Sequence, residues 1–480
     1  MANEKNENKN AETLMEMLRS ADASANQDAV SALRAFFDNG SFVGLSAYMT
    51  RSEGSAEKES VECGYGSVQG RPVFALAQDS SNMGGAVTSR QVSKIKALYK
   101  RAIQNGSPVV AFFNSIGGSI DEGSALLSAY GEWMHCVSMA KGVVPQIAVV
   151  SGKCTGLLSA VAQMYDFVIT TEESEMYFSP AFLVGDDFSN NNAVASAGLS
   201  AYTAKDTASA SAFARELVSL LPLNVTDSKC VFECEDDLNR ALTLAIDENY
   251  DLRAVVSELS DNRRFLELSK DYAPALCTGF ATFDGILCGI VANDHAVNGG
   301  VMTAEACRKA AAFVRFCNAF GITVVTLVDT VGLEVSAESE AAGIMRAASD
   351  MALAYSQATS AKVTVVLGKA YGAGFTLMAS RALGADETLA LREALISPMK
   401  PDSAVAFADN DSVSGGKTRE EVEAEWIAEN CPAVLAAANG DIDEIVDASF
   451  LRAHLCIAVG TFSSKSSVKT DSRFASFFGI

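Results

Sequence analysis

Four short glycine-containing segments are the part of this chain with the clearest capacity for chemistry. Each follows an apolar run with the character of a strand and precedes a stretch with the character of a helix. Glycine at such a turn exposes backbone N–H groups. These can bind an anion or stabilise an oxyanion that forms only in a transition state, a contribution of about 3–4 kcal/mol per donor. The segments are Ser115-Ile116-Gly117-Gly118, Gly152-Lys153-Cys154-Thr155-Gly156, Thr330-Val331-Gly332 and Gly368-Lys369-Ala370-Tyr371-Gly372.

Side chains offer few alternatives to these backbone amides. The chain has only three histidines, His135, His295 and His454, and they are scattered along the sequence. It lacks the Gly-x-Ser-x-Gly, His-Glu-x-x-His, P-loop and Gly-x-Gly-x-x-Gly motifs of hydrolases, zinc proteases and nucleotide-binding proteins. The glycines could serve only to allow tight turns. Their occurrence in matched pairs favours a reaction that relies on backbone N–H groups.

The matched pairs belong to a repeat that covers most of the chain. Ala77-Gln78-Asp79, Gly84-Gly85 and Lys94 recur as Ala292-Asn293-Asp294, Gly299-Gly300 and Lys309, at a constant offset of 215 residues. Repeats of solenoid proteins are much shorter, about 20–50 residues. The long offset therefore predicts two whole domains of one fold, with an active site shared between such domains because pockets favour domain interfaces.

Strands that alternate with helices predict an α/β fold with mostly parallel sheets. The glycine segment 152–156 is expected to be the turn that ends a strand at 147–150, and Ala193–Leu220 is expected to be helical. A helix is also expected from about Glu338. The domains are expected to be an N-terminal extension of residues 1–30, disordered or helical, an N-terminal domain of residues 31–235 and a C-terminal domain of residues 236–480.

Composition narrows the class of protein. The 480 residues carry a net charge of −22 without a run of Lys or Arg, which argues against a nucleic-acid partner. The 11 cysteines show no framework spacing, so we expect buried reduced thiols and no metal site. No signal peptide and no apolar stretch of about 18 residues is visible. These features predict a cytoplasmic protein.

The segments resemble the carboxyltransferase component of biotin-dependent acyl-CoA carboxylases and decarboxylases, of the propionyl-CoA carboxylase beta and methylmalonyl-CoA decarboxylase alpha type. The resemblance covers roughly residues 30–460. It rests on Ser115–Gly123 with the sequence SIGGSIDEG, Gly152–Gly156, Tyr250-Asp251-Leu252-Arg253, Phe265-Leu266-Glu267-Leu268, Gly289–Asn293, Asp329-Thr330-Val331-Gly332 and Lys369-Ala370-Tyr371-Gly372. Each motif is weak alone, but together they are specific.

The resemblance implies two tandem crotonase-like domains of the ClpP/crotonase superfamily, each a ββα superhelix. The family moves a carboxyl group between carboxybiotin and the α-carbon of a short acyl-CoA, such as propionyl/methylmalonyl-CoA or acetyl/malonyl-CoA. The CoA thioester binds mainly on the N-terminal domain and biotin on the C-terminal domain. The active site lies between domains of different protomers, usually in a hexamer. This mechanism needs no protein base, which agrees with the few histidines.

The resemblance also implies roles for individual residues. The N–H groups of Gly156 and Leu157 are expected to face the thioester oxygen, and those of Ala373 and Gly374 the ureido oxygen of biotin. Further binding residues are expected to be Gly117, Gly118, Thr155, Tyr371, Gly372 and Thr376. On this basis Gly156→Pro is expected to abolish transfer in a folded protein.

The chain departs from the family pattern at several of these positions. Leu157 and Ala373 replace glycines, so Leu157 is expected to add bulk near the thioester. Ser119 replaces an arginine, and Thr376 replaces a residue that is often Asp. Because Thr376 occupies a position that tunes the choice of acyl chain, the substrate of a relative does not transfer directly to this chain.

The expected partners follow from the absence of a biotin-attachment motif, since no Met-Lys-Met occurs. Biotin is then carried by a separate carrier protein, next to a biotin carboxylase or a membrane decarboxylase subunit. The chain itself is expected to form a homo-oligomer, from a dimer to a hexamer. One alternative is a non-catalytic or structural homologue within such a complex. Another is a crotonase-like enzyme that acts on CoA thioesters without biotin.

Overall fold

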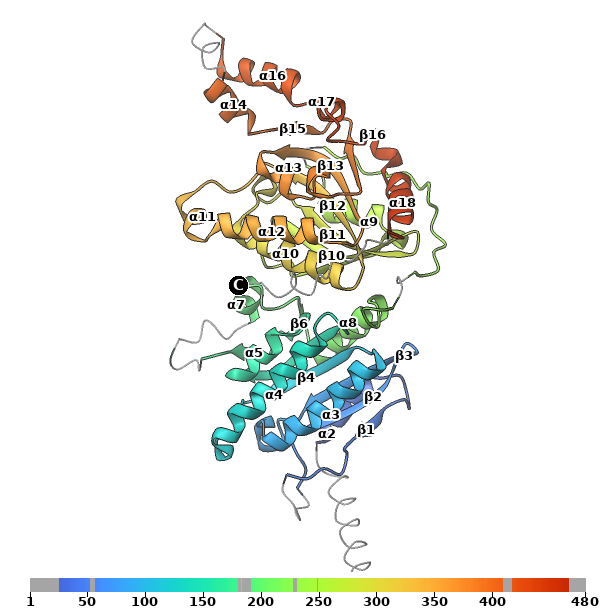
Figure 1. Ribbon diagram of the computed structural model, residues 1–480, viewed down its shortest axis with the longest axis vertical. Helices are drawn as coiled ribbons and strands as arrows, with labels where there is room; N and C mark the ends of the chain where they lie inside the picture. The colour runs from blue at the N-terminus through green and yellow to red at the C-terminus, as the bar shows by residue number, and fades with distance from the viewer. Residues whose placement is uncertain are drawn as a thin grey trace, which may run out of the picture. The chain divides into compact units, whose positions relative to one another are not determined.

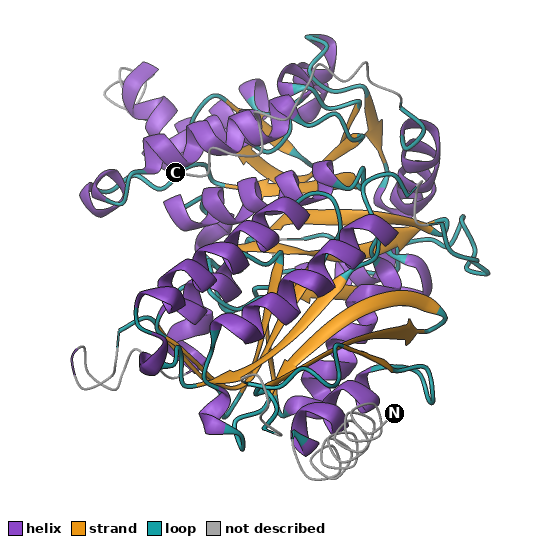
Figure 2. Ribbon diagram, turned by 60° about the horizontal axis from the view of Figure 1, so that its bottom comes forward, coloured by secondary structure: helices purple, strands orange, loops and turns teal. Residues whose placement is uncertain are grey.

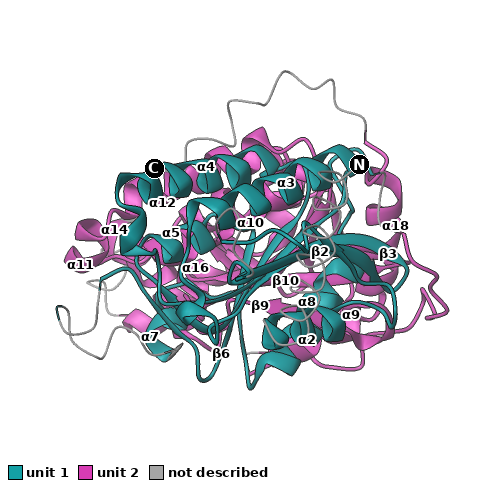
Figure 3. Cartoon of the chain, turned by 90° about the horizontal axis from the view of Figure 1, so that it is seen from below, with its two compact units in different colours: residues 1–227 teal, residues 228–480 magenta. Residues whose placement is uncertain are grey.

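The computed structural model describes residues 26–51, 57–179, 183, 191–227, 231–247, 249–408 and 417–465. The chain divides into two compact units, residues 1–227 (unit 1) and 228–480 (unit 2) (Figure 3). The division falls a few residues before the boundary that we placed after residue 235. Most of the expected N-terminal extension, residues 1–25, lies outside the described residues.

Unit 1 is built on a sheet of eight strands in the order β1-β2-β3-β4-β5-β6-β8, with β7 paired to β5 (Figure 1). The strands from β3 to β8 pair in parallel. The strands are β1 (Val43–Leu45), β2 (Val61–Val68), β3 (Arg71–Gln78), β4 (Val109–Ser115), β5 (Gln146–Thr155), β6 (Phe167–Thr171), β7 (Glu175–Tyr177) and β8 (Tyr202–Ala204). The helices are α2 (Gln27–Phe36), α3 (Ser89–Asn105), α4 (Ser124–Ala140), α5 (Leu157–Gln163), α7 (Asn191–Ser196) and α8 (Thr207–Leu220), with short 3-10 turns η1 (Met83–Gly85) and η2 (Ile120–Glu122).

Unit 2 has a sheet of eight strands in the order β9-β10-β11-β12-β13-β14-β16, with β15 paired to β13. The strands are β9 (Phe265–Leu268), β10 (Leu276–Phe283), β11 (Ile286–Asn293), β12 (Thr323–Thr330), β13 (Lys362–Tyr371), β14 (Glu387–Leu391), β15 (Leu395–Ser397) and β16 (Glu444–Val446). The helices are α9 (Leu252–Leu259), α10 (Ala304–Ala319), α11 (Ala337–Ala341), α12 (Ile344–Gln357), α13 (Ala373–Leu377), α14 (Pro401–Ala408), α16 (Arg419–Asn430), α17 (Ala433–Ala438) and α18 (Leu451–Phe462), with 3-10 turns η4 (Asp261–Arg263), η5 (Asn298–Gly300), η6 (Arg381–Leu383) and η7 (Ala448–Phe450).

The two sheets repeat one topology, as the repeat in the sequence predicts. Each has a strand off the main path, β7 or β15, that pairs with the strand carrying the second glycine segment. Each also has one isolated parallel bridge beside its first glycine segment, between Val87 and Gly118 in unit 1 and between Met302 and Leu333 in unit 2. Helices and strands alternate along both units, so the α/β prediction is confirmed. Figure 2 distinguishes the helices from the strands of the molecule.

The prediction that residues 152–156 form the turn after a strand is wrong in part. Strand β5 continues through Gly152 to Thr155 and exchanges its partner on the way. Residues Ile147–Val150 pair with β6, and residues Lys153–Thr155 pair with β7. A Cβ at Gly152 would lie 2.2 Å from Oδ1 of Asn114 on β4. Gly152 therefore permits a close approach inside the sheet, and the chain turns only at Gly156.

The expected helical segment Ala193–Leu220 is also divided. It contains α7, then β8 and then α8. The alanine content favours a helix here, but Tyr202 to Ala204 pair with β6 at the sheet edge, and tertiary pairing overrides local propensity. The helix expected from Glu338 is likewise two helices, α11 and α12, separated by Gly343 with φ of 80°.

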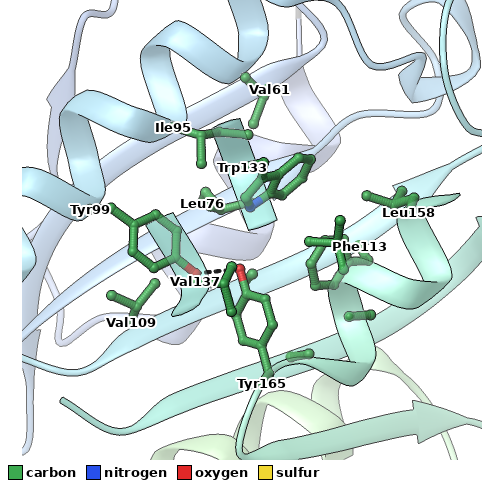
Figure 4. Packing of buried hydrophobic residues seen from close by; sticks show 14 of the residues in the cluster. Val61, Leu76, Ile95, Tyr99, Val109, Phe113, Trp133, Val137, Leu158 and Tyr165 are labelled. Atoms are coloured by element: carbon green, nitrogen blue, oxygen red, sulfur yellow. Dashed lines mark hydrogen bonds between the residues drawn. The ribbon is translucent and has the colours of Figure 1, made fainter. Parts of the chain in front are cut away.

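The core of unit 1 encloses a small buried polar cluster (Figure 4). The hydroxyl of Tyr99 lies 2.7 Å from that of Tyr165 and 3.2 Å from Oε1 of Gln146. Trp133 and Tyr165 both pack against Phe113, with ring centroids 5.8 and 5.5 Å away. The cluster joins α3 to the strand that leads into the second glycine segment, so it supports the position of that segment.

We expect Tyr165→Phe to lower the free energy of unfolding by about 1 kcal/mol, because it removes one partner of a buried hydrogen bond. Tyr130→Phe is the matched control, since the buried Tyr130 hydroxyl has no hydrogen-bond partner among the described residues. Its removal should be neutral or slightly stabilising. Urea unfolding followed by Trp133 fluorescence, in a Trp426→Phe background, measures both. Equal effects of the two substitutions would contradict the role of the cluster.

Candidate active site

The residues that define the repeat serve the fold. The ammonium of Lys94 is buried and donates to the Val61 carbonyl at 2.8 Å and to Glu62 at 3.2 Å. Lys309 donates to three carbonyl oxygens, those of Ser269, Tyr272 and Leu276. Asp79 and Asp294 are buried and hold neighbouring segments through hydrogen bonds. These repeated side chains fix the sheets and helices that carry the glycine segments.

The first segment of unit 1 turns sharply after β4. Gly117 has φ of 106° and donates its N–H to Oγ of Ser115 at 3.1 Å, while its carbonyl accepts from Val87 N–H at 2.8 Å. Ser119 N–H donates to the Val87 carbonyl at 2.9 Å. In a parallel bridge of this kind the intervening N–H points away from the partner strand. Accordingly, the N–H of Gly118 has no acceptor within the part of unit 1 that the structure describes.

The second segment of unit 1 turns at Gly156. This residue has φ of 63° and ψ of −141°, a backbone conformation that is almost restricted to glycine. Its N–H donates to the Tyr177 carbonyl at 3.0 Å, which ties β7 to the end of β5. The N–H of Leu157, the first residue of α5, has no acceptor among the described residues, as is usual for the first residues of a helix.

This geometry corrects the expected role of Gly156. Its N–H is used within the fold and does not face a ligand, so Gly156 shapes the turn while Leu157 carries the open donor. The expectation that Gly156→Pro leaves the fold intact is also wrong. Proline fixes φ near −65° and lacks the N–H that bonds to Tyr177. The substitution would disrupt the turn itself and would not report on catalysis.

The two segments of unit 1 lie beside each other. A Cβ at Gly117 would lie 3.4 Å from both the carbonyl oxygen and Oγ1 of Thr155, the residue before Gly156. The open N–H groups of Gly118 and Leu157 therefore belong to adjoining turns. Leu157 packs part of its side chain against the core of unit 1. The expectation that Leu157 adds bulk near the thioester stays a prediction.

Unit 2 repeats the arrangement. Gly332 has φ of 110°, donates to Oγ1 of Thr330 at 3.0 Å and accepts from Met302 N–H at 2.9 Å. Gly372 has φ of 58° and ψ of −140°, and its N–H donates to the Ser397 carbonyl at 2.9 Å. Within the described residues, the N–H groups of Leu333, Ala373 and Gly374 have no acceptor.

The two turns of unit 2 also adjoin. A Cβ at Gly374 would lie 2.7 Å from Cγ2 of Thr330 and 3.2 Å from Cα of Gly332. Ala373 and Thr376, three residues apart on α13, are both exposed, so they share the open face of this short helix. Tyr371 is buried, and burial raises its pKa to about 12, which makes it a poor acid at neutral pH. Sequence reasoning missed Leu333 as a donor.

The two units differ in one buried polar group beside these turns. Unit 1 has Asn114 at the end of β4, whereas unit 2 has the carboxylate of Asp329 at the matching place on β12. The Tyr250 hydroxyl donates to Asp329 at 3.0 Å, and Nδ1 of His295 lies 3.8 Å from the same oxygen. Sequence reasoning did not bring these residues together, although Tyr250 and Asp329 both lie in the motifs that carry the resemblance.

Within the described part of the chain, no group of three or more His, Cys, Asp or Glu side chains could hold a metal ion. Among the same residues, no helix is both long and apolar enough to cross a membrane.

Comparisons with known proteins agree with the geometry. Residues 23–475 match the carboxyl transferase domain family. The chain is 32% identical to the methylmalonyl-CoA carboxyltransferase 12S subunit of Propionibacterium freudenreichii subsp. shermanii, covering 87% of this chain and 84% of that protein. It is 30% identical to the methylmalonyl-CoA decarboxylase subunit alpha of Propionigenium modestum, covering 92% and 91%.

The fold of this chain also agrees with that of a solved relative. A crystal structure of a transcarboxylase 12S hexamer, with methylmalonyl-coenzyme A and methylmalonic acid bound, superposes with a TM-score of 0.89 at 30% identity and covers 96% of this chain and 97% of that one. Its tandem crotonase-like domains confirm the expected fold class. Since the family match spans nearly the whole chain and the relatives align along most of their length, the chain belongs to the carboxyl transferase domain family.

Proposed function

We propose that this chain is a biotin-dependent carboxyltransferase that moves a carboxyl group between carboxybiotin and the α-carbon of a short acyl-CoA. The observation that carries the proposal is the duplicated pair of open backbone N–H groups, Gly118 with Leu157 in unit 1 and Leu333 with Ala373 in unit 2. A reaction with two developing oxyanions needs two such pairs. The names of the relatives favour propionyl/methylmalonyl-CoA, and acetyl/malonyl-CoA has the same reacting group.

Unit 1 is assigned to the thioester. The N–H groups of Gly118 and Leu157 donate to the thioester oxygen and stabilise the negative charge that grows on it as the α-carbon becomes an enolate. Donors that are already fixed by the fold pay no reorganisation cost during the reaction. Gly117 and Thr155 hold the two turns against each other, and Gly156 sets the direction of Leu157.

Unit 2 is assigned to the ureido group of biotin. The open donors there are neutral N–H groups, which suits an oxygen that is uncharged in the ground state and negative in the transition state. Leu333 and Ala373 provide the two hydrogen bonds, with Gly374 next to them and Gly372 shaping the turn. Thr376 lies on the open face of α13, where it would contact the ligand. When bound through its carrier, biotin supplies the carboxyl group and a nitrogen that accepts the α-proton.

The proposal extends to partners and assembly. A separate biotin carrier, together with a biotin carboxylase or a membrane decarboxylase subunit, would supply or consume the carboxyl group. By resemblance to the family, a homo-oligomer between a dimer and a hexamer would bring the thioester-binding unit of one protomer to the biotin-binding unit of another. The hexamer reported for the transcarboxylase 12S relative supports the upper end of this range.

The decisive test is carboxyl exchange with free biotin. The purified full chain is incubated with malonyl-CoA or methylmalonyl-CoA that carries a labelled carboxyl group, with and without biotin. We expect biotin-dependent loss of the label. Loss that does not depend on biotin would favour a crotonase-like enzyme without biotin. Binding of acyl-CoA, measured by calorimetry, without any exchange would favour the non-catalytic homologue.

A further inference from the structure

The carboxylate of Asp329 connects several segments of unit 2 directly beside the ureido-binding turn. Its Oδ1 accepts the backbone N–H of Lys369 on β13 at 2.8 Å, and its Oδ2 accepts the Tyr250 hydroxyl at 3.0 Å. Its own N–H donates to Oδ1 of Asn293 at the end of β11, at 3.3 Å. Nδ1 of His295 lies 3.8 Å from Oδ2. Asp329 is 6% exposed, so these contacts are shielded from water.

The position of Asp329 in the chain links it to both open donors. It immediately precedes the turn from Thr330 that presents the N–H of Leu333. Its partner Lys369 lies at the end of β13, four residues before Ala373. A Cβ at Gly368 would lie 2.6 Å from Cγ of Asp329, so the carboxylate fits tightly against this strand. Any displacement of Asp329 therefore changes the relative position of the two N–H groups.

Unit 1 provides an internal comparison. Asn114 occupies the matching position on β4, and its Oδ1 accepts Lys153 N–H at 3.3 Å. Its Nδ2 donates to Oγ of Ser80 at 3.0 Å, and Ser80 lies at the offset of 215 residues from His295. A neutral Ser–Asn pair beside the thioester-binding turn thus corresponds to a His–Asp pair beside the ureido-binding turn. The repeated fold is preserved, and only the charge beside the turn differs.

A buried negative charge beside an oxygen that becomes negative is unfavourable, because charges interact more strongly away from water. The His295 imidazole and the Tyr250 hydroxyl both face the carboxylate of Asp329. The rings of His295 and Tyr250 stack with their centroids 4.3 Å apart. The nearby carboxylate of Asp294 is already paired with Arg253 at 2.6 Å. The hydrogen bond from the Tyr250 hydroxyl therefore offsets part of the charge of Asp329 beside the turn.

We propose that Asp329 is a positioning residue of the ureido-binding turn: its carboxylate fixes the end of β13 relative to the turn that presents the N–H of Leu333. The proposal rests on the proposed function, since it assigns a role at the same turn. It predicts that loss of the carboxylate weakens the biotin side of the reaction and leaves the acyl-CoA side unchanged.

The test compares Asp329→Asn, Asp329→Ala and the control Asn114→Ala in the labelled exchange with free biotin. Asp329→Ala loses the bond to Lys369 N–H, so KM for biotin should rise about tenfold or more while KM for acyl-CoA stays unchanged. Asn114→Ala should instead raise the KM for acyl-CoA and leave the KM for biotin unchanged. Asp329→Asn copies unit 1 and keeps an acceptor for Lys369, so it should retain most activity.

Several outcomes would overturn the proposal. One is a loss of activity in Asp329→Asn as large as that in Asp329→Ala, and another is the same change in both KM values for Asp329→Ala and Asn114→Ala. If Asp329→Ala does not fold, Asp329→Asn decides alone: any rise in KM should be confined to biotin, and an equal rise in the KM for acyl-CoA would overturn the proposal. A wild-type protein without biotin-dependent exchange would instead contradict the proposed function, so the two failures are distinguishable.

Discussion

Gly118→Pro is expected to lower kcat for carboxyl exchange by about 10²–10³-fold, the usual cost of removing one oxyanion donor. The N–H of Gly118 has no acceptor in the described part of unit 1, so its loss breaks no hydrogen bond of the fold there. The backbone of Gly118 is not in the left-handed region, so a residue with a side chain meets no left-handed strain there. The expected loss in kcat reflects weaker stabilisation of the negative charge that grows on the thioester oxygen in the transition state.

Gly118→Ala is the matched control for this prediction. A Cβ at Gly118 would lie 2.4 Å from Cδ2 of Leu126, the end of a flexible side chain that must move in both variants. Alanine imposes this contact but keeps the N–H, so it should retain most of the wild-type kcat. Steady-state exchange with saturating biotin measures both variants. Equal losses for alanine and proline would show that crowding against Leu126, and not the missing donor, is responsible.

Ala373→Pro is expected to cause a loss of similar size on the biotin side. Ala373 is the first residue of α13, a position where proline is favoured because its missing N–H has no helical partner. Gly372 before it has ψ of −140°, far from the helical value at which proline clashes with the preceding residue. Ala373 is exposed, so the larger ring needs no space in the core.

Ala373→Ser, which keeps the N–H and adds one oxygen, is the control for this variant. Both proteins should unfold at the wild-type temperature. The proline variant should lose about 10²–10³-fold in kcat for exchange with free biotin, whereas its dissociation constant for acyl-CoA should stay at the wild-type value. A proline variant with wild-type exchange would remove Ala373 from the donors and leave Leu333 and Gly374 as the pair to test.

The parts of the fold that follow local patterns could be predicted from the sequence. The strands of β4 and β12 are continuous apolar runs, and the offset between Gly117 and Gly332 revealed two copies of one domain. The exchange of partners along β5 could not be predicted. It depends on β7, whose pairing with Lys153 to Thr155 is a contact between segments that are separated in the chain.

The open N–H donors could be predicted only in part, because contacts between segments that are separated in the chain decide which of them stay open. A glycine-rich turn indicates which segment carries open N–H groups, but hydrogen bonds to distant carbonyls decide which N–H remains open. Tyr177 takes the N–H of Gly156, and the bridge to Met302 leaves that of Leu333 open. The association of Tyr250 and His295 with Asp329 likewise depends on tertiary structure, because the three residues come from separate segments.

The use of main-chain donors has a consequence for how this protein tolerates mutation and diverges. Three residue types carry the four open N–H groups: glycine at 118, leucine at 157 and 333, and alanine at 373. Almost any amino acid supplies the same N–H, so drift at these positions would leave the chemistry unchanged. Selection would instead act on Gly156 and Gly372, whose backbone conformation few other residues adopt. In such a lineage, the residues that look most changeable are the ones that touch the reacting atoms.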